Sequence, residues 1–305
     1  TDRRKFINFH TSSVFREKFW KKLWEMKIDT HIIIGNHDTY FKNTNKVNSV
    51  DELCSTFDGV HEPFIYTGPK EVELGGCRML FLPWICDDNY EDSIYAIDNS
   101  TADICFGHLE VKGFEMQKGL FNEHGLEPTQ FKRFEKVMSG HFHKKSDDGH
   151  IYYLGSPYEL YWNDCEDRKG FHVFDTETRE LERILNPRTI HKKIYYNDTD
   201  TDYKQHDITQ YKDNYVKVIV VNKKDLYQFD QFVDKLLQAD CHEVKIIEDF
   251  SDLDANSVSD DIVENTQDTM TLLSMYIDEL DTSLSKGRLK NIQRELYTEA
   301  QDLQI

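Results

Sequence analysis

The chain has 305 residues, of which 38% are apolar and 13% aromatic, enough to fill the core of one large domain or of two domains. It carries 37 basic and 56 acidic residues and a formal net charge of −19, which argues against a protein that wraps nucleic acid with a basic surface. Six cysteines without a C-x-x-C pair exclude a disulfide framework or a zinc knuckle, and no apolar run is long enough to span a membrane. Reduced thiols of this kind are typical of a cytoplasmic protein.

The first half of the chain alternates helical and strand-like patterns. Residues 12–27 repeat Phe15, Phe19, Leu23 and Met26 at helical spacing. With Trp20 and Trp24, this helix is either a self-association surface or part of the core. Short apolar runs then predict strands at 32–34, 79–82, 104–106, 137–138, 151–154 and 171–174. A Gly-Gly pair at 75–76 marks a hairpin turn, and the whole pattern predicts an α/β fold with stacked sheets.

The amino-acid composition of the chain changes near residue 187. Residues 186–207 are polar and turn-rich, which predicts a boundary between a domain at 1–189 and a smaller α+β domain at 190–247. In the latter, 214–221, 225–238 and 242–247 read as strand, helix and strand. Residues 246–268 hold eight acids and no lysine or arginine, so 248–268 is expected to be an acidic linker. Residues 269–305 are predicted to form a helical module that packs back on the body or docks on another protein, because their apolar residues fall on one stripe: Leu289, Ile292, Leu296, Tyr297, Ala300 and Leu303.

Three predicted strands end in glycine followed by polar, metal-binding residue types. The three ends are Gly35-Asn36-His37-Asp38, Gly107-His108 and Gly140-His141-Phe142-His143. Glycine permits a tight turn there, and α/β enzymes gather their sites at the carboxyl ends of strands. Taken alone, Gly107-His108 is more often a structural histidine. Together, the three ends predict a hydrolytic centre for Mn, Fe or Zn, since imidazole, amide oxygen and carboxylate suit these metals.

These motifs, followed by YLGSPYEL, resemble the calcineurin-like metallophosphoesterases, and within them the SbcD-type DNA nuclease subunits in their T-even phage version. The segments FLPWICDDN, CFGHLEVKGF, EHGLEP and RKGFHVFDTETRE match in the same order, so the resemblance covers nearly the whole chain. It implies a metallophosphoesterase sandwich of two stacked β-sheets flanked by helices. A small α+β capping domain and a C-terminal helical tail would follow.

The resemblance also implies a two-metal phosphodiesterase site with two divalent ions, Mn²⁺ in the first place and Mg²⁺ as the alternative. Asn36, His108 and His141 would hold one ion, and His143 would bind the other. The catalytic residues would be His37, which faces the scissile phosphate, and Asp38, which orients His37.

The chain departs from the family in its first two motifs, Asp-x-His and Gly-Asp. No glycine is followed by aspartate. Asp29-Thr30-His31 begins the strand that Gly35 ends, roughly 15 Å from the site at 3.3 Å per residue. Asp148-Gly149-His150 reads as a hairpin turn. The missing motifs are therefore expected upstream of Thr1, and the polypeptide as written is expected to be impaired.

The implied function is that of a nuclease subunit in an SbcCD-type complex, a metal-dependent DNA exo- and endonuclease in DNA recombination, repair and replication. The capping domain would position double-stranded DNA. Residues 269–305 would dock on an SbcC-type ABC/SMC coiled-coil ATPase, with a homodimer inside a heterotetramer and no membrane partner. The rivals are a phosphoesterase with a non-DNA substrate and a non-catalytic scaffold that recruits the ATPase to DNA ends. Six basic residues either contact phosphates or are ordinary surface: Lys112, Lys118, Lys132, Arg133, Lys144 and Lys145.

Overall fold

A computed structural model describes residues 6–54, 63–117 and 120–247, together with 277, 285–290 and 292. The chain divides into two compact units. The first holds the described residues up to Leu160 and Glu166–Ile190, and the second holds Tyr161–Cys165 and the described residues from His191 onward. The predicted linker at 248–268 and most of the predicted module at 269–305 lie outside the described residues. In the part that is described, no helix combines the length and the apolar character needed to cross a membrane.

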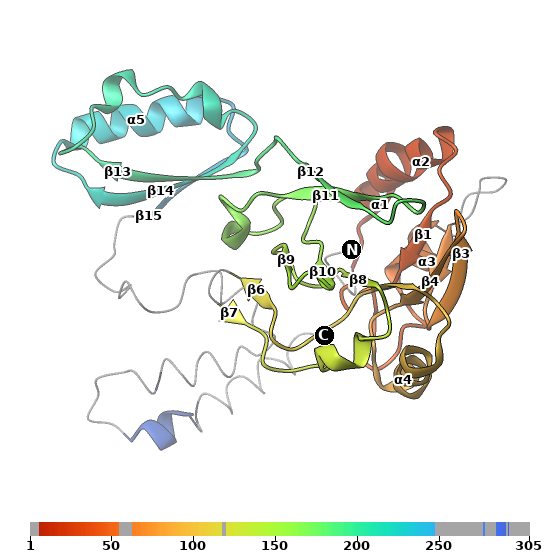
Figure 1. Cartoon of the computed structure of the whole chain (residues 1–305). Helices are drawn as coiled ribbons and strands as arrows, with labels where there is room; N and C mark the ends of the chain where they lie inside the picture. The colour runs from red at the N-terminus through yellow and green to blue at the C-terminus, as the bar shows by residue number, and fades with distance from the viewer. Residues whose placement is uncertain are drawn as a thin grey trace. The chain divides into compact units, whose positions relative to one another are not determined.

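A six-stranded sheet with the order β3-β4-β5-β8-β10-β9 is the main sheet of the first unit (Figure 1). The four central strands run parallel, and β3 and β9 are antiparallel to their neighbours. Leu80, Cys105 and Val137 in the central strands are buried, as expected for a parallel sheet covered on both faces. The strands are β3 (Lys70–Leu74), β4 (Cys77–Leu82), β5 (Ile104–Gly107), β8 (Lys136–Ser139), β9 (Ser146–Asp147) and β10 (Ile151–Tyr153).

Each face of the main sheet packs against different elements. On one face, Leu80 and Val137 contact the cluster of Ile97 from helix α4 (Tyr90–Asn99) and Phe131. On the other face, Met79 and Ile104 share a cluster with two short strand pairs. These pairs are β1 (His31–Ile33) with β2 (Phe64–Tyr66), and β11 (Gly170–Phe174) with β12 (Leu181–Leu185). The predicted α/β sandwich of stacked sheets flanked by helices is confirmed.

The predicted strands are found within one or two residues of their expected ends. The Gly-Gly turn is confirmed as well, because Leu74 pairs with Cys77 across Gly75 and Gly76. Both glycines have positive φ, +55° and +74°, as a tight two-residue hairpin turn requires. The remaining short elements are α3 (Ser49–Cys54), β6 (Glu115–Gln117), β7 (Leu120–Phe121) and the 3₁₀ turns Asp87–Asn89, Pro128–Phe131, Trp162–Asp164, Tyr203–Gln205 and Thr209–Tyr211.

The N-terminal helical region differs from the predicted stripe. It consists of α1 (Phe9–Phe15), a π-helical turn at Arg16–Trp20 and α2 (Lys21–Glu25). Trp20 is 2% exposed and packs with Ile34, whereas the predicted Phe19 and Met26 are 50% and 68% exposed. A π turn takes more residues per turn than an α-helix, so it rotates the following side chains relative to a 3.6-residue pattern. Trp20 therefore occupies the core position assigned to Phe19.

The second unit is a three-stranded parallel sheet with one helix on it (Figure 1). The strands are β13 (His191–Asn197), β14 (Tyr215–Asn222) and β15 (Glu243–Ile247), and α5 (Leu226–Gln238) covers one face. Val218 of β14 and Phe232 of α5 are buried in its core. The segment 186–207 is not simply a polar boundary, because it contains β13. The polar residues Lys192 and Lys193 hide the strand pattern in the sequence, and the buried positions of β13 are His191, Ile194 and Tyr196.

Candidate metal centre

The ends of four strands meet at one edge of the first unit. β5 and β8 are parallel neighbours, and Gly140 N donates to Gly107 O at 2.9 Å just beyond them. Trp84 N, after β4, donates to Ile34 O, after β1, at 2.7 Å. These backbone bonds bring together the glycine-containing turns that follow β1, β5 and β8. The three candidate motifs are therefore neighbours in space.

His108 lies between two of the glycines. Its Nε2 is 2.9 Å from Asn36 Oδ1, which accepts the hydrogen bond. A Cβ atom at Gly35 would lie 2.8 Å from His108 Cε1, and one at Gly140 would lie 3.3 Å from His108 Nδ1. The strand before Gly35 therefore ends in glycine because the imidazole of His108 occupies the space that a side chain would need.

His141 completes a cluster with His108 and Asn36. The centroids of the two imidazole rings are 5.1 Å apart, at an interplanar angle of 67°. His141 also has a φ of +85°, a conformation that residues other than glycine rarely adopt. Such a backbone costs about 1–3 kcal/mol and is concentrated at functional sites. The strained backbone therefore lies at the residue whose ring packs against His108.

The environment of the two histidines keeps them neutral. Burial lowers the pKa of His108 well below its usual 6.5, and the neighbouring His141 lowers it further. Burial also lowers the pKa of His141 to about 4, with His37 and His143 as the next causes. Near neutral pH both imidazoles thus have the uncharged form that binds metal ions. The same interactions place His37 and His143 within electrostatic range of both His108 and His141.

The side chains gathered here supply part of the ligand set that one metal ion needs. Asn36 Oδ1 and His108 Nε2 face each other, and the ring of His141 is adjacent. An amide oxygen with imidazole nitrogens suits Mn, Fe or Zn. Within the described ranges, however, no three side chains of His, Cys, Asp or Glu are grouped as a metal site would need. The described residues thus do not by themselves form the complete ligand set of a two-metal centre.

Comparison with known proteins places the chain in a family. No protein-family model matches it. It is 34% identical over 304 residues to "Exonuclease subunit 1" of Enterobacteria phage T4, an alignment that covers 98% of this chain and 85% of that relative. The chain belongs to the exonuclease subunit 1 family. The resemblance to a T-even phage nuclease subunit, predicted from the motifs, is confirmed.

The turn after β1 presents His37 in this member of the exonuclease subunit 1 family. The His37 side chain is exposed beside the buried Asn36. Asp38 Oδ2 accepts a hydrogen bond from Gly35 N at 2.8 Å, and Asp38 N donates to Gly35 O at 3.0 Å. Asp38 therefore fixes the turn that carries Asn36 and His37. The predicted roles of His37 at the phosphate and of Asp38 in orienting it stay predictions.

His143 is half-buried, and its backbone is held from two sides. Its carbonyl oxygen accepts from Ser156 N at 3.0 Å and from Lys169 Nζ at 2.9 Å. Lys169 is only 3% exposed, and its Nζ lies 2.9 Å from Asp167 Oδ2. Sequence reasoning did not identify Lys169, since a lysine in the polar segment DRKGF has no pattern that indicates burial.

Trp84 is a second residue that sequence reasoning missed. Its ring centroid lies 5.4 Å from that of His141 and 6.3 Å from that of His108. It follows β4, and so it lies at the same edge of the sheet as the histidines. The available signal was its place directly after an apolar strand, in the segment FLPW.

The two alternative Asp-x-His triplets lie in other surroundings. His31 Nδ1 is 2.7 Å from the Tyr66 hydroxyl, and its ring stacks on Phe64, so it packs at the start of β1. Asp148-Gly149-His150 forms the predicted turn between β9 and β10. There His150 Nε2 donates to Phe134 O at 2.7 Å. Both histidines thus take part in structural contacts.

Proposed function

We propose that this protein is the nuclease subunit of a DNA end-processing and recombination complex. It would hydrolyse DNA phosphodiester bonds at the centre formed by Asn36, His108 and His141. The observation that carries the proposal is the convergence of these side chains at adjoining strand ends in a chain of the exonuclease subunit 1 family. The name of the T4 relative describes that protein as an exonuclease, and the amide oxygen and imidazole nitrogens gathered here are ligand types used by metal-dependent hydrolases.

The proposed cofactors are two divalent ions, with Mn²⁺ preferred and Mg²⁺ as the alternative. Asn36 Oδ1 with His108 and His141 would hold the first ion, and His143 would contribute to the second. When bound, such ions activate a water molecule and offset the negative charge that develops on the phosphate. The protein's own part is to keep the imidazoles neutral by burial and to fix their positions through glycine contacts and backbone hydrogen bonds.

His37 is the residue proposed to act on the phosphate. Its exposed ring stands next to Asn36 on the turn that Asp38 fixes, so a phosphate at the centre would lie within its reach. In the protonated form, a ring nitrogen would donate a hydrogen bond to a phosphoryl oxygen or a proton to the leaving oxygen. Such general acid catalysis typically contributes about 10²–10⁴-fold.

The proposed partners are double-stranded DNA and an SbcC-type ATPase. The name of the T4 relative calls it a subunit, which supports an assembly with at least one other chain. Residues 190–247 would help to position the DNA. A partner subunit would supply the basic surface that a chain of net charge −19 lacks.

The test is manganese titration by calorimetry together with cleavage of a linear duplex in Mn²⁺. The chain, supplied with the Asp-x-His and Gly-Asp motifs expected upstream of Thr1 and co-expressed with its partner subunit, is expected to bind Mn²⁺ and to cleave. His141→Ala should lose both properties, and His37→Ser should keep Mn²⁺ binding but lose cleavage. His124→Ala is the matched control, because His124 is exposed and belongs to none of the three motifs. Cleavage that survives His141→Ala would contradict the proposal.

The absence of a three-ligand group among the described residues favours one alternative, a non-catalytic scaffold that recruits the ATPase to DNA ends. In that case the wild-type chain would associate with the ATPase and with DNA but would cleave nothing in Mn²⁺ or Mg²⁺. The same assays therefore separate the two functions.

A further inference from the structure

The loop 39–48 follows His37 and Asp38 directly and carries two neighbouring aromatic side chains. Tyr40 is 41% exposed and Phe41 is 49% exposed. Their ring centroids are 4.7 Å apart, at an interplanar angle of 72°. We call these two residues the aromatic pair. The exposed rings of this pair lie directly after His37 and Asp38 of the proposed phosphodiester site.

The backbone of the loop is closed at its base. Thr39 and Asn48 form an antiparallel bridge. Tyr40 N donates to Val47 O at 2.9 Å, and Ser49 N donates to Asp38 O at 2.8 Å. The two ends of the loop are therefore held together immediately beside Asp38, so the aromatic pair has a fixed place relative to the turn that carries His37.

Buried asparagines attach the loop to the metal centre. Asn45 is 2% exposed, and its Nδ2 donates to Trp84 O at 2.7 Å and to Thr67 O at 3.2 Å. Asn48 Nδ2 donates in turn to Asn45 O at 3.0 Å. Trp84 is the residue whose ring packs on His141. The same tryptophan thus contacts the centre through its ring and the loop through its carbonyl.

A rigid, exposed aromatic pair offers a surface for stacking bases. Base–aromatic stacking tolerates any sequence, because every base has a π face. It also depends little on charge, which matters for a chain of net charge −19 that attracts phosphates poorly. Bases in an intact duplex are stacked on one another, so only an unpaired nucleotide could use the pair.

We propose that Tyr40 and Phe41 form a stacking site for the bases of an unpaired DNA end next to the scissile phosphate. The inference rests on the proposed nuclease function and adds to it a preference for frayed or single-stranded termini. The aromatic pair would hold the terminal bases while the adjoining phosphate lies at the centre. Lys42, which is exposed beside Phe41, could contact the backbone of the same strand.

The test measures binding of the full chain to single-stranded oligonucleotides in EDTA, so that no cleavage occurs. One oligonucleotide has normal bases with 2-aminopurine at its end, and a second of equal length has abasic terminal positions. The wild type should bind the first more tightly and change its 2-aminopurine fluorescence. Phe41→Ala should weaken binding to the normal oligonucleotide by about tenfold, with little effect on the abasic one.

Matched variants separate stacking from general effects. Phe41→Tyr keeps a ring and should bind as the wild type does, whereas Phe41→Leu keeps apolar bulk without a ring and should behave as Phe41→Ala. Tyr95→Ala removes an aromatic ring that is 70% exposed on α4 and should change nothing. Retained thermal stability of each variant shows that the fold is intact.

The outcomes distinguish this inference from the proposed function. Unchanged affinity and fluorescence in both Tyr40→Ala and Phe41→Ala would overturn the stacking site and leave the nuclease function in place. A wild type that binds neither oligonucleotide and cleaves no DNA would overturn both. If the alanine variants lose self-association in sedimentation but keep the preference for normal over abasic DNA, the pair is a protein contact and the inference is wrong.

Discussion

At the residue scale, the position of the His108 ring depends on the absence of a side chain at Gly35. We expect Gly35→Ala to push the ring off Asn36, because the new Cβ would lie 2.8 Å from His108 Cε1. The variant should lose most Mn²⁺ affinity in calorimetry. Gly68→Ala is the matched control, since nothing lies within 4 Å of a Cβ built there. Equal affinity in both variants would show that the His108 ring can move without cost.

For Lys169 the prediction concerns stability, because its side chain contacts the backbone carbonyl of His143. Lys169→Met removes the donor at 2.9 Å from His143 O and the partner of Asp167. The loss of a buried hydrogen-bond partner costs about 1–3 kcal/mol. We expect a reduction of this size in the free energy of unfolding, measured in urea.

Lys112→Met is the control for this change, because Lys112 pairs with Glu127 on the surface, with side chains 46% and 56% exposed. Exposed ion pairs contribute about 0–1 kcal/mol. If both variants lose the same stability, Lys169 has no special role in holding the loop of His143.

The sequence predicts the inner residues of the centre better than those that hold it in place. Asn36, His108 and His141 follow glycines at strand ends, a local pattern that the chain displays directly. Trp84 and Lys169 contact the centre from segments that are remote in sequence, and they use a ring face and a backbone carbonyl. Such contacts leave no periodic pattern, so the sequence gives no signal for Lys169 and, for Trp84, only its place after an apolar strand.

At the scale of elements, the sequence predicts the central strands better than it predicts the N-terminal helical region. Apolar runs identify the central strands because both faces of the main sheet are buried. The π turn at Arg16–Trp20 cannot be read from a 3.6-residue period, because it shifts the phase partway along the helix. The result is that Phe19 and Trp24, 50% and 42% exposed, stay on the surface.

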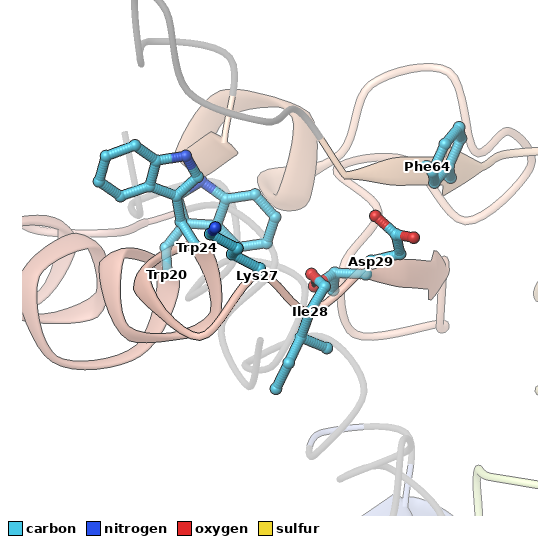
Figure 2. Close-up of a pocket in the computed structure, with 7 residues that line it drawn as sticks. Trp20, Trp24, Lys27, Ile28, Asp29 and Phe64 are labelled. Carbon is cyan, nitrogen blue, oxygen red and sulfur yellow. Dashed lines mark hydrogen bonds between the residues drawn. The ribbon is translucent and has the colours of Figure 1, made fainter.

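The exposed side of this helical region supports the proposal that the subunit self-associates. Figure 2 shows Trp20 and Trp24 at a small pocket that is also lined by Lys27, Ile28, Asp29, Thr30 and Phe64. We expect the double substitution of Phe19 and Trp24 by serine to shift the protein toward monomer in sedimentation velocity. The physical reason is the loss of exposed apolar area, worth about 25 cal/mol per Å² when buried between copies.

The retained Trp20 and a control variant make the result of this experiment interpretable. Trp20 is left in place because it is buried in the core of the helical region, so the fold should persist. Tyr95→Ser on α4 is the control, because it removes an aromatic ring that is 70% exposed on another surface. An unchanged sedimentation coefficient for the double variant would place the self-association surface elsewhere.

At the scale of the whole molecule, the net charge and the position of the candidate ligands indicate that metal binding and DNA capture depend on different surfaces. All candidate metal ligands lie between Asn36 and His143, within the first unit. The excess of 19 negative charges repels DNA at a distance, so capture of DNA has to depend on local contacts or on a partner's basic surface. A module that recruits such a partner need not share any residue with the metal centre.

Deletion of 269–305 tests that separation. We expect the shortened chain to bind Mn²⁺ with unchanged affinity, because the deletion removes no candidate ligand, and to lose association with the ATPase subunit and with it ATP-stimulated cleavage. Calorimetry, co-purification and cleavage assays with and without ATP are the measurements. A full-length chain with Leu289 and Ile292 both changed to aspartate is the control, since it keeps the length but breaks the apolar stripe. Association that survives both changes would assign ATPase binding to another part of the chain, whereas its loss in both would locate the contact on the stripe.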